Sequence, residues 1–210
     1  MRFPIPVLLA LGALPVADVQ AIDRCPIRPG TACVAANLRG ATLPKADLAL
    51  ADLTRSDLSG ADLNGARLDR AKLQRVNFQR ANLTQASLER ASLRGANLSG
   101  ATLVKANLSA ADLNGATLTD ADLRDATLNG TNLWGARMGS TKLRGADLER
   151  ADLRAADLRG ARLEGANLRG VRFEKANLEG ANLTGALLDK ATFRDANVRG
   201  CTGCPKPTTP

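Results

Sequence analysis

The sequence predicts a β-solenoid, a rod in which the chain turns by the same amount at every repeat. Three observations predict it. Residues 36–200 repeat every five residues without an insertion, which makes 33 consecutive units. The third residue of each unit is Leu in almost every copy, and two residues earlier stands Ala. The fifth residue is Gly in nearly half of the units, as in Ala61-Asp62-Leu63-Asn64-Gly65.

This period excludes the regular secondary structures. Five residues advance an α-helix by about 500°, so successive Leu side chains would be scattered around it instead of forming one apolar stripe. On a flat strand side chains alternate with a period of two, so successive Leu would point to opposite faces. A chain that turns regularly instead directs every Leu and Ala toward a common axis and leaves the other three positions in water.

Each position of the unit then has a predicted role. Leu at position three fills the interior, and Ala at position one fits where the wall bends close to the axis. Gly at position five takes a positive φ at little cost, which suits a corner. Asn or Asp at position two is expected to bond along the stack or to close the turns. The exceptions at position three, which we expect to fill the core, are Phe78, Met138, Phe173, Phe193 and Val198.

The motif Ala-[Asp/Asn]-Leu-x-x resembles the pentapeptide repeat family, and it covers 165 of 210 residues. The resemblance implies an all-β, right-handed quadrilateral β-helix with four pentapeptides per coil. The 33 units then make about eight coils, and at ~4.8 Å per coil the rod is on the order of 40 Å long. Residues twenty apart would stack in columns, so we name the four faces after Leu38, Leu43, Leu48 and Leu53.

Residues 1–21 are typical of a signal peptide. Arg2 provides a positive start, and residues 7–14 form an apolar run that is too short to span a bilayer. Small residues in Val19-Gln20-Ala21 predict cleavage before Ile22. An uncleaved anchor is the alternative, whereas a lipoprotein is disfavoured because Cys25 follows no small apolar box. We therefore expect an exported protein, periplasmic or secreted, with no transmembrane segment in the mature chain.

Four cysteines flank the repeats, in an N-terminal cap (22–35) and a C-terminal cap with a Pro/Thr tail (201–210). An even number of cysteines in an exported chain indicates disulfides. The rod separates the two pairs by far more than the ~7 Å that a disulfide tolerates between Cα atoms. Within one molecule, the pairs are therefore Cys25–Cys33 and Cys201–Cys204. Intermolecular pairing and a redox role for Cys201-x-x-Cys204 are the alternatives, although no helix is predicted there to activate a thiol.

The composition argues against an enzyme. The chain contains no His, the commonest general base and metal ligand in proteins. Its acidic residues are scattered over all four faces, and no phosphate-binding or metal-binding motif is present. We predict no catalytic residue, cofactor, metal or small-molecule substrate. The net charge of +8 favours acidic partners, or it serves solubility alone.

The Leu53 face is the candidate for a surface contact. In this register it carries eight basic against five acidic residues, while the Leu48 face balances at zero. It also holds the lone Trp, which points outward, and an exposed Trp beside Arg is a plausible contact point. The alternative is a surface ring that only packs against an arginine stem. The candidate residues are Trp134, Arg94, Arg154, Arg172, Lys175 and Arg194.

The sequence favours a non-enzymatic scaffold or interaction rod in the cell envelope, whose partner is an unidentified protein or an anionic envelope component. The alternative is binding of an anionic polymer or lipid surface through the basic face around Trp134. One exposed aromatic gives no stacking platform, so nucleic acid is not favoured over acidic glycan or lipid head groups. The resemblance also implies a third function, because some members mimic DNA and bind type II topoisomerases. A basic, exported chain disfavours it, and the sequence indicates no oligomeric state.

Overall fold

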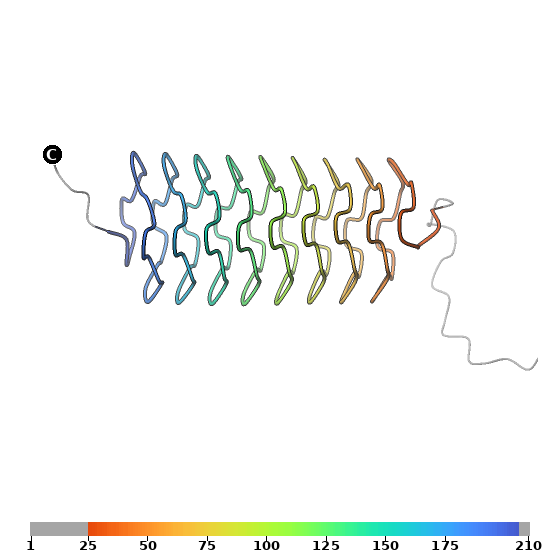
Figure 1. Ribbon diagram of the computed structural model, residues 1–210, viewed down its shortest axis with the longest axis horizontal. Helices are drawn as coiled ribbons and strands as arrows, with labels where there is room; N and C mark the ends of the chain where they lie inside the picture. Colours follow the sequence, from red (N-terminus) through yellow and green to blue (C-terminus); the bar gives the residue numbers. More distant parts are fainter. Residues whose placement is uncertain (1–24, 206–210) are drawn as a thin grey trace, which may run out of the picture.

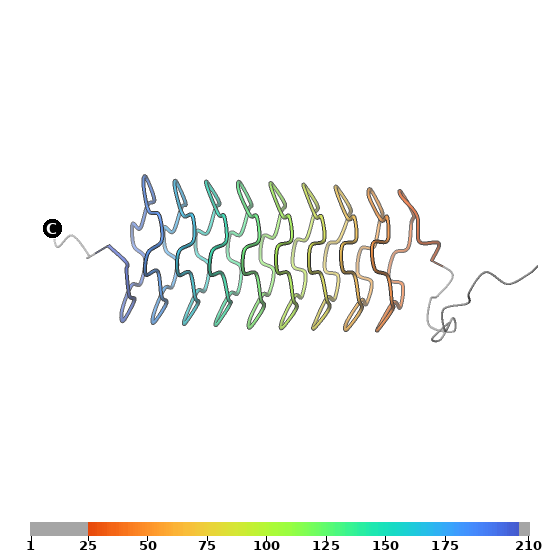
Figure 2. The same ribbon diagram turned by 90° about the horizontal axis from the view of Figure 1, so that it is seen from below.

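The computed structural model describes residues 25–205, which form a rod of stacked coils (Figure 1). Every β-bridge is parallel and joins residues twenty positions apart, from Ala32↔Asp52 to Asn182↔Thr202. One coil therefore takes four pentapeptides, and the bridged span of residues 32–202 makes about eight and a half coils. A view turned by 90° shows the same regular stacking (Figure 2). The predicted signal peptide and its cleavage site before Ile22 lie outside the described residues.

Hydrogen bonds between coils follow one pattern in every unit. Residues 25–205 contain no helix, and each strand is a single bridge residue at position two, every fifth residue from 32 to 202. The N–H groups of positions three and five donate to the next coil, as Leu38 does to Asp57 (2.7 Å) and Gly40 to Ser59 (2.8 Å). The position-two N–H donates to the preceding coil. Each unit is thus tied by three bonds, two of which point toward the C-terminal end.

The corners are four-residue turns. The N–H of position one donates to the carbonyl of position three in the preceding unit, as Ala41 does to Leu38 (3.1 Å). Position five is the third residue of this turn and has a positive φ, as type II turns require. Nineteen non-Gly residues adopt this φ, between 54° and 61°, and ten of them are Arg or Lys. The structure therefore keeps one backbone conformation at the corner even where the residue type disfavours it.

Position two stabilises these corners in both of the expected ways. Its side-chain oxygen accepts the N–H two residues later, as Asp52 Oδ1 does from Thr54 (3.2 Å). An Asn also donates to the column neighbour one coil earlier, as Asn77 Nδ2 does to Asp57 Oδ1 (3.0 Å). Asp and Asn thus close the turn and join adjacent coils.

Relief of corner strain is a testable consequence. We expect Arg75→Gly to stabilise the rod by about 0.5–1 kcal/mol, because removal of the left-handed strain outweighs the entropy that Gly gains in the unfolded chain. Arg144→Gly is the matched control at position four, where φ is not positive, and it should destabilise by about the same amount. Urea denaturation measures both variants. Destabilisation by both substitutions would contradict the assignment of strain to position five.

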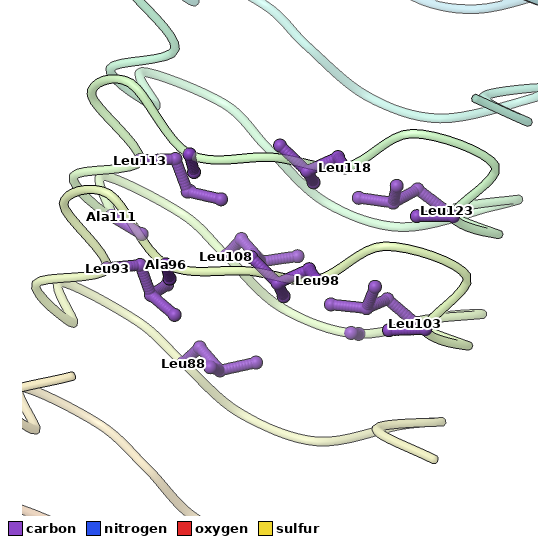
Figure 3. Packing of buried hydrophobic residues seen from close by; sticks show 14 of the residues in the cluster. Leu88, Leu93, Ala96, Leu98, Leu103, Leu108, Ala111, Leu113, Leu118 and Leu123 are labelled. Carbon is purple, nitrogen blue, oxygen red and sulfur yellow. The ribbon is translucent and has the colours of Figure 1, made fainter. Parts of the chain in front are cut away.

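Positions one and three line a closely packed bore. Figure 3 shows Leu93, Leu98 and Leu103 beneath Leu113, Leu118 and Leu123 of the next coil, and all six are fully buried. The predicted core fillers Phe78, Met138 and Phe173 are also fully buried. Phe173 stacks on the partly buried Phe193 of the last coil with ring centroids 4.9 Å apart. Aromatic rings therefore fill the end of the Leu53 column, as we expected.

The polar exceptions at position one are satisfied inside the bore. Thr131 donates its hydroxyl to the Leu108 carbonyl (2.9 Å), and Ser56 donates to the Cys33 carbonyl (2.7 Å). A buried hydroxyl with a backbone acceptor avoids most of its desolvation cost. The bore thus accepts a small polar residue wherever a carbonyl of the preceding coil lies within reach.

The regular backbone begins at Thr31, five residues earlier than the sequence predicts. Ala32 forms the first bridge, Ala35 has the corner φ of 56°, and Cys33 occupies position three with 6% of its surface exposed. The sequence places this unit in the cap (22–35), whereas in the structure Cys33 takes the Leu position of a regular unit. At the other end Thr202 forms the last bridge, and Gly203 stands at position three. With φ +77°, a Cβ on Gly203 would lie 2.7 Å from the Leu183 carbonyl.

The two ends of the rod differ. At the N-terminal end the Cys25–Cys33 disulfide (Cα–Cα 5.5 Å) is buried, and Ile27 packs against the core. The bore residues of that coil, Leu38, Leu43 and Leu48, are at most 7% exposed. At the C-terminal end Cys201 and Cys204 form the second disulfide (Cα–Cα 5.7 Å), and both are partly exposed. Both pairings match those expected for a single molecule. Among residues 25–205, no helix is long and apolar enough for a bilayer.

Candidate interaction surface

Trp134 lies on the outside of the rod, as its register predicts. It occupies position four of the Leu53 face, and 49% of its surface is exposed. Its backbone N–H donates to Asn132 Oδ1 (3.2 Å), which fixes the corner beneath the ring. The bridge between Asn132 and Asp152 places Arg154 one coil further along the same column. The indole is therefore held on a rigid backbone and is free to contact a partner.

The five basic candidates do not form one basic patch. Arg154 donates to both carboxylate oxygens of Asp152, at 2.8 and 2.6 Å. Arg172 contacts the same carboxylate (3.6 Å), and Arg94 lies 3.7 Å from Asp112. Three of the five cations are therefore paired with acids of their own face. Lys175 and Arg194 make no ion pair within residues 25–205.

The paired arginines change the acidity of their partners. The Arg154 guanidinium lowers the pKa of Asp152 by direct hydrogen bonds, and the Arg154 backbone N–H adds to the effect, whereas burial opposes it. Arg159 lowers the pKa of Asp157 in the same way. Both pairs belong to Asp-Leu-Arg sequences, in which positions two and four lie on the same side of the strand. An Asp-Leu-Arg tripeptide in the sequence therefore indicates an arginine that is paired with the Asp two residues before it.

Loss of one guanidinium should be visible in a titration. We expect Arg154→Gln to raise the pKa of Asp152 toward the ordinary value of about 3.9, while Asp157 keeps its lowered pKa. An Asp with a lowered folded pKa stabilises the protein above its unfolded pKa, and this contribution is lost as pH falls through the folded value. Carboxyl chemical shifts followed by NMR between neutral and acidic pH measure both groups. An unchanged Asp152 would show that the pair does not persist in solution.

Four unpaired arginines lie in the N-terminal half of the rod. Arg55, Arg70, Arg75 and Arg80 form no ion pair within the described residues, and all four stand at position-five corners with positive φ. Arg55 and Arg75 are in one corner column, one coil apart. Counting charges by face misses these free arginines, because the count gives equal weight to paired and free side chains. The run of Arg at position five, at residues 70, 75 and 80, is the sequence signal that locates them.

Several depressions on the described surface are open to solvent. A depression of about 440 Å³ is lined by charged and glycine corners, including Arg124, Asp125 and Glu164, and it opens to solvent. Among residues 25–205 no group of three or more Cys, Asp or Glu is placed to hold a metal ion. The geometry suits contact with a large partner better than enclosure of a small molecule.

Comparison with known proteins agrees with this geometry. The family model described as pentapeptide repeats matches residues 33–70, 71–109, 106–145, 135–170 and 166–202. The structure is similar to that of HetL, a pentapeptide repeat protein involved in heterocyst differentiation regulation from the cyanobacterium Nostoc sp. strain PCC 7120. Sequence identity is 34%, the TM-score is 0.61, and the match covers 83% of this chain and 88% of HetL.

A second similar structure is a trypsin-treated form of QnrB1, a plasmid-mediated fluoroquinolone resistance protein. Its identity is 24% and its TM-score 0.59, over 74% of this chain and 81% of QnrB1, which supports the fold alone. No curated protein sequence matches significantly. Since the family model spans nearly all of the described rod, the chain belongs to the pentapeptide repeat family.

Proposed function

We propose that this protein is an exported, non-enzymatic interaction rod of the cell envelope, built as the right-handed quadrilateral β-helix that its family implies. The observation that carries the proposal is that each unit has two buried positions and three positions that face outward. Positions one and three are consumed by the bore, where Leu and Ala are almost completely buried. Positions two, four and five remain for recognition, on a backbone that every coil holds in the same conformation.

The family supports an interaction role, since pentapeptide repeat proteins are generally structural or interaction proteins. HetL, which is similar over most of its length, is described as a participant in regulation. The basic charge of +8 argues against mimicry of DNA, because a mimic of a polyanion has to be acidic. We therefore place the partner in the envelope and not among DNA-binding enzymes.

Export rests on the sequence of residues 1–21 and has a direct test. Cell fractionation followed by N-terminal sequencing should find the protein outside the cytoplasm with Ile22 as its first residue. An intact Met1 on cytoplasmic protein would overturn the proposal of export. The interaction role is tested separately, by cross-linking the purified rod to an envelope fraction. We expect a saturable cross-linked species of defined mass. Its absence, with a control protein of known partner succeeding, would contradict the role.

Binding of an anionic polymer is a second candidate, and the unpaired corner arginines favour it. The rod should be retained on heparin at low salt and released at moderate salt, as expected for contacts with anionic groups. The double variant Arg55→Glu/Arg75→Glu should elute early, whereas Arg154→Glu/Arg172→Glu, which changes the net charge equally at two arginines already paired with Asp152, should elute nearly unchanged. Equal losses in both variants would argue for net charge alone, and no retention of the unmodified rod would exclude this function.

A further inference from the structure

The C-terminal end of the rod leaves part of its bore uncovered. Leu188, Phe193 and Val198 occupy position three in the last coil and are only partly buried, whereas position-three residues of the preceding coils are almost fully buried. Beside them, Leu187 is 42% exposed. The upper face of the Phe193 ring carries no further ring, although its lower face stacks on Phe173. Apolar surface is therefore available here and is covered at the N-terminal end.

The same end presents backbone groups that lack partners. Phe173 and Leu178 donate their N–H groups to Thr192 (2.8 Å) and Asn197 (2.7 Å) of the last coil. Phe193 and Val198, which hold the same positions one coil later, donate to no backbone carbonyl within residues 25–205, nor do position-five residues Asp195 and Gly200. The carbonyls of Ala191 and Ala196 likewise accept no backbone bond in this range. Each exposed unit thus offers two donors and one acceptor.

These donors add up to a directional electrostatic effect. Each unit has three peptide groups that join neighbouring coils, and two of the three point their N–H toward the C-terminal end. One net peptide dipole of about 3.5 D per unit gives ~14 D per coil of ~4.8 Å, which is comparable to an α-helix of the same length. The C-terminal end therefore carries a partial positive charge of roughly half an elementary charge, spread over its edge.

Side chains at this end have the same sign. Lys190, Arg194 and Arg199 make no ion pair within the described residues. Asp189 is occupied by Arg169 (3.0 Å), which leaves Asp195 as the unpaired acid of the coil. The surroundings of the exposed bore are therefore cationic, and a ligand rich in carboxylates and carbonyl oxygens is the electrostatic complement.

From these observations we propose that the C-terminal end binds an extended, acidic segment of a partner protein that carries a large apolar side chain. The segment adds to the last coil as one more strand and accepts hydrogen bonds from the N–H groups of Phe193 and Asp195, which belong to the same unit. Its apolar side chain covers the open ring of Phe193, and its acidic side chains face Arg194 and Arg199. The inference names the docking end of the proposed interaction rod and therefore rests on that role, though not on export.

A second copy of the chain fits this end poorly. Two C-terminal ends brought together would oppose donor-rich edges and two rings of cations. The N-terminal edge of a second copy offers the complementary carbonyls, but there the buried Cys25–Cys33 disulfide and Ile27 cover the bore. An acidic strand from another protein has neither obstacle.

The test uses the purified rod and a synthetic probe, acetyl-Asp-Val-Asp-Phe-Asp-Val-Asp-amide, with a control peptide in which Lys replaces every Asp. We expect saturable binding of the acidic probe by fluorescence anisotropy, with amide NMR shifts confined to residues 186–204. Arg199→Glu should weaken binding about fivefold, as expected for loss and reversal of one exposed charge. Arg39→Glu is the matched control in the same column at the other end of the rod, and it should bind like the unmodified protein.

Several outcomes would overturn the inference. Absence of binding, equal binding of the acidic and Lys peptides, or shifts spread along the faces would each do so. A dimer in analytical ultracentrifugation whose interface protects the last coil would identify a second copy as the occupant. Last-coil amides that are protected without peptide, and that become exposed when residues 206–210 are deleted, would identify the chain's own tail. None of these results excludes an interaction role for the faces, so the broader proposal fails or survives separately.

Discussion

Leu113→Ala should destabilise the rod by about 2–5 kcal/mol, the largest loss that we expect from one substitution. Leu113 is fully buried in the bore (Figure 3). It packs in a column in which the preceding and following coils also place Leu, at residues 93 and 133. Truncation to Ala removes three carbons that are fully buried and leaves a cavity in the bore. The neighbouring coils cannot close the cavity without breaking their own hydrogen bonds. Urea denaturation followed by circular dichroism measures the change.

Leu50 provides a matched control for this substitution. It is the same residue type at position five, where 60% of its surface is exposed and its φ is 61°. Leu50→Ala should change the free energy of unfolding by no more than about 0.5 kcal/mol. Equal losses in the two variants would contradict the assignment of position three to the bore and position five to the corner.

The second large effect is expected from the N-terminal disulfide. Replacement of Cys25 and Cys33 by Ser should lower the free energy of unfolding by about 2–3 kcal/mol, since the bond closes a loop of nine residues. The first coil should open with it, because Cys33 is also a buried bore residue. Hydrogen exchange of amides in residues 31–50 reports that opening, while thermal unfolding gives the global loss.

The C-terminal disulfide is the comparison. Cys201 and Cys204 are partly exposed at an end whose bore is already open. Their replacement by Ser should affect amides near residue 202 and leave the first coil protected. Mild reductant should also reach this pair before the buried N-terminal pair. Loss of protection at the first coil in the C-terminal variant would show that the two ends are coupled, contrary to their local packing.

The bore was predictable because one rule acts on every unit. With Ala and Leu at fixed spacing in a five-residue period, only a regularly turning chain buries both in every unit. Phe78 and Met138 stand at the Leu position and are buried in the same way. The corner was predictable in kind from its glycines. Its tolerance of Arg and Lys was not, since single-residue preferences disfavour a positive φ for both. Stacked turns of identical geometry, one in every unit, override a local preference worth about 1–2 kcal/mol.

The candidate surface was predictable in position and not in charge. The register placed Trp134 outside, which is where it lies. Whether Arg154 is paired depends on its side-chain rotamer. In the structure the guanidinium turns to Asp152, two residues earlier, and donates to its carboxylate instead of extending into solvent. The unit at residues 31–35 was not predicted, because its position three holds Cys33 in place of Leu. The sequence predicts a C-terminal cap at residues 201–210, but it could not predict how much of the last coil stays uncovered, since that depends on what lies above the bore.

The twenty-residue coil makes length and surface pattern separable. Deletion of five residues from the middle of the rod keeps every Leu in the bore, yet it moves all later outward residues to the next face. Deletion of twenty residues shortens the rod by one coil and leaves each face with its own column, apart from one missing row. The length of the rod can therefore change in steps of one strand spacing, and its outward residues can be moved by a quarter turn to the next face, without any change to its interior.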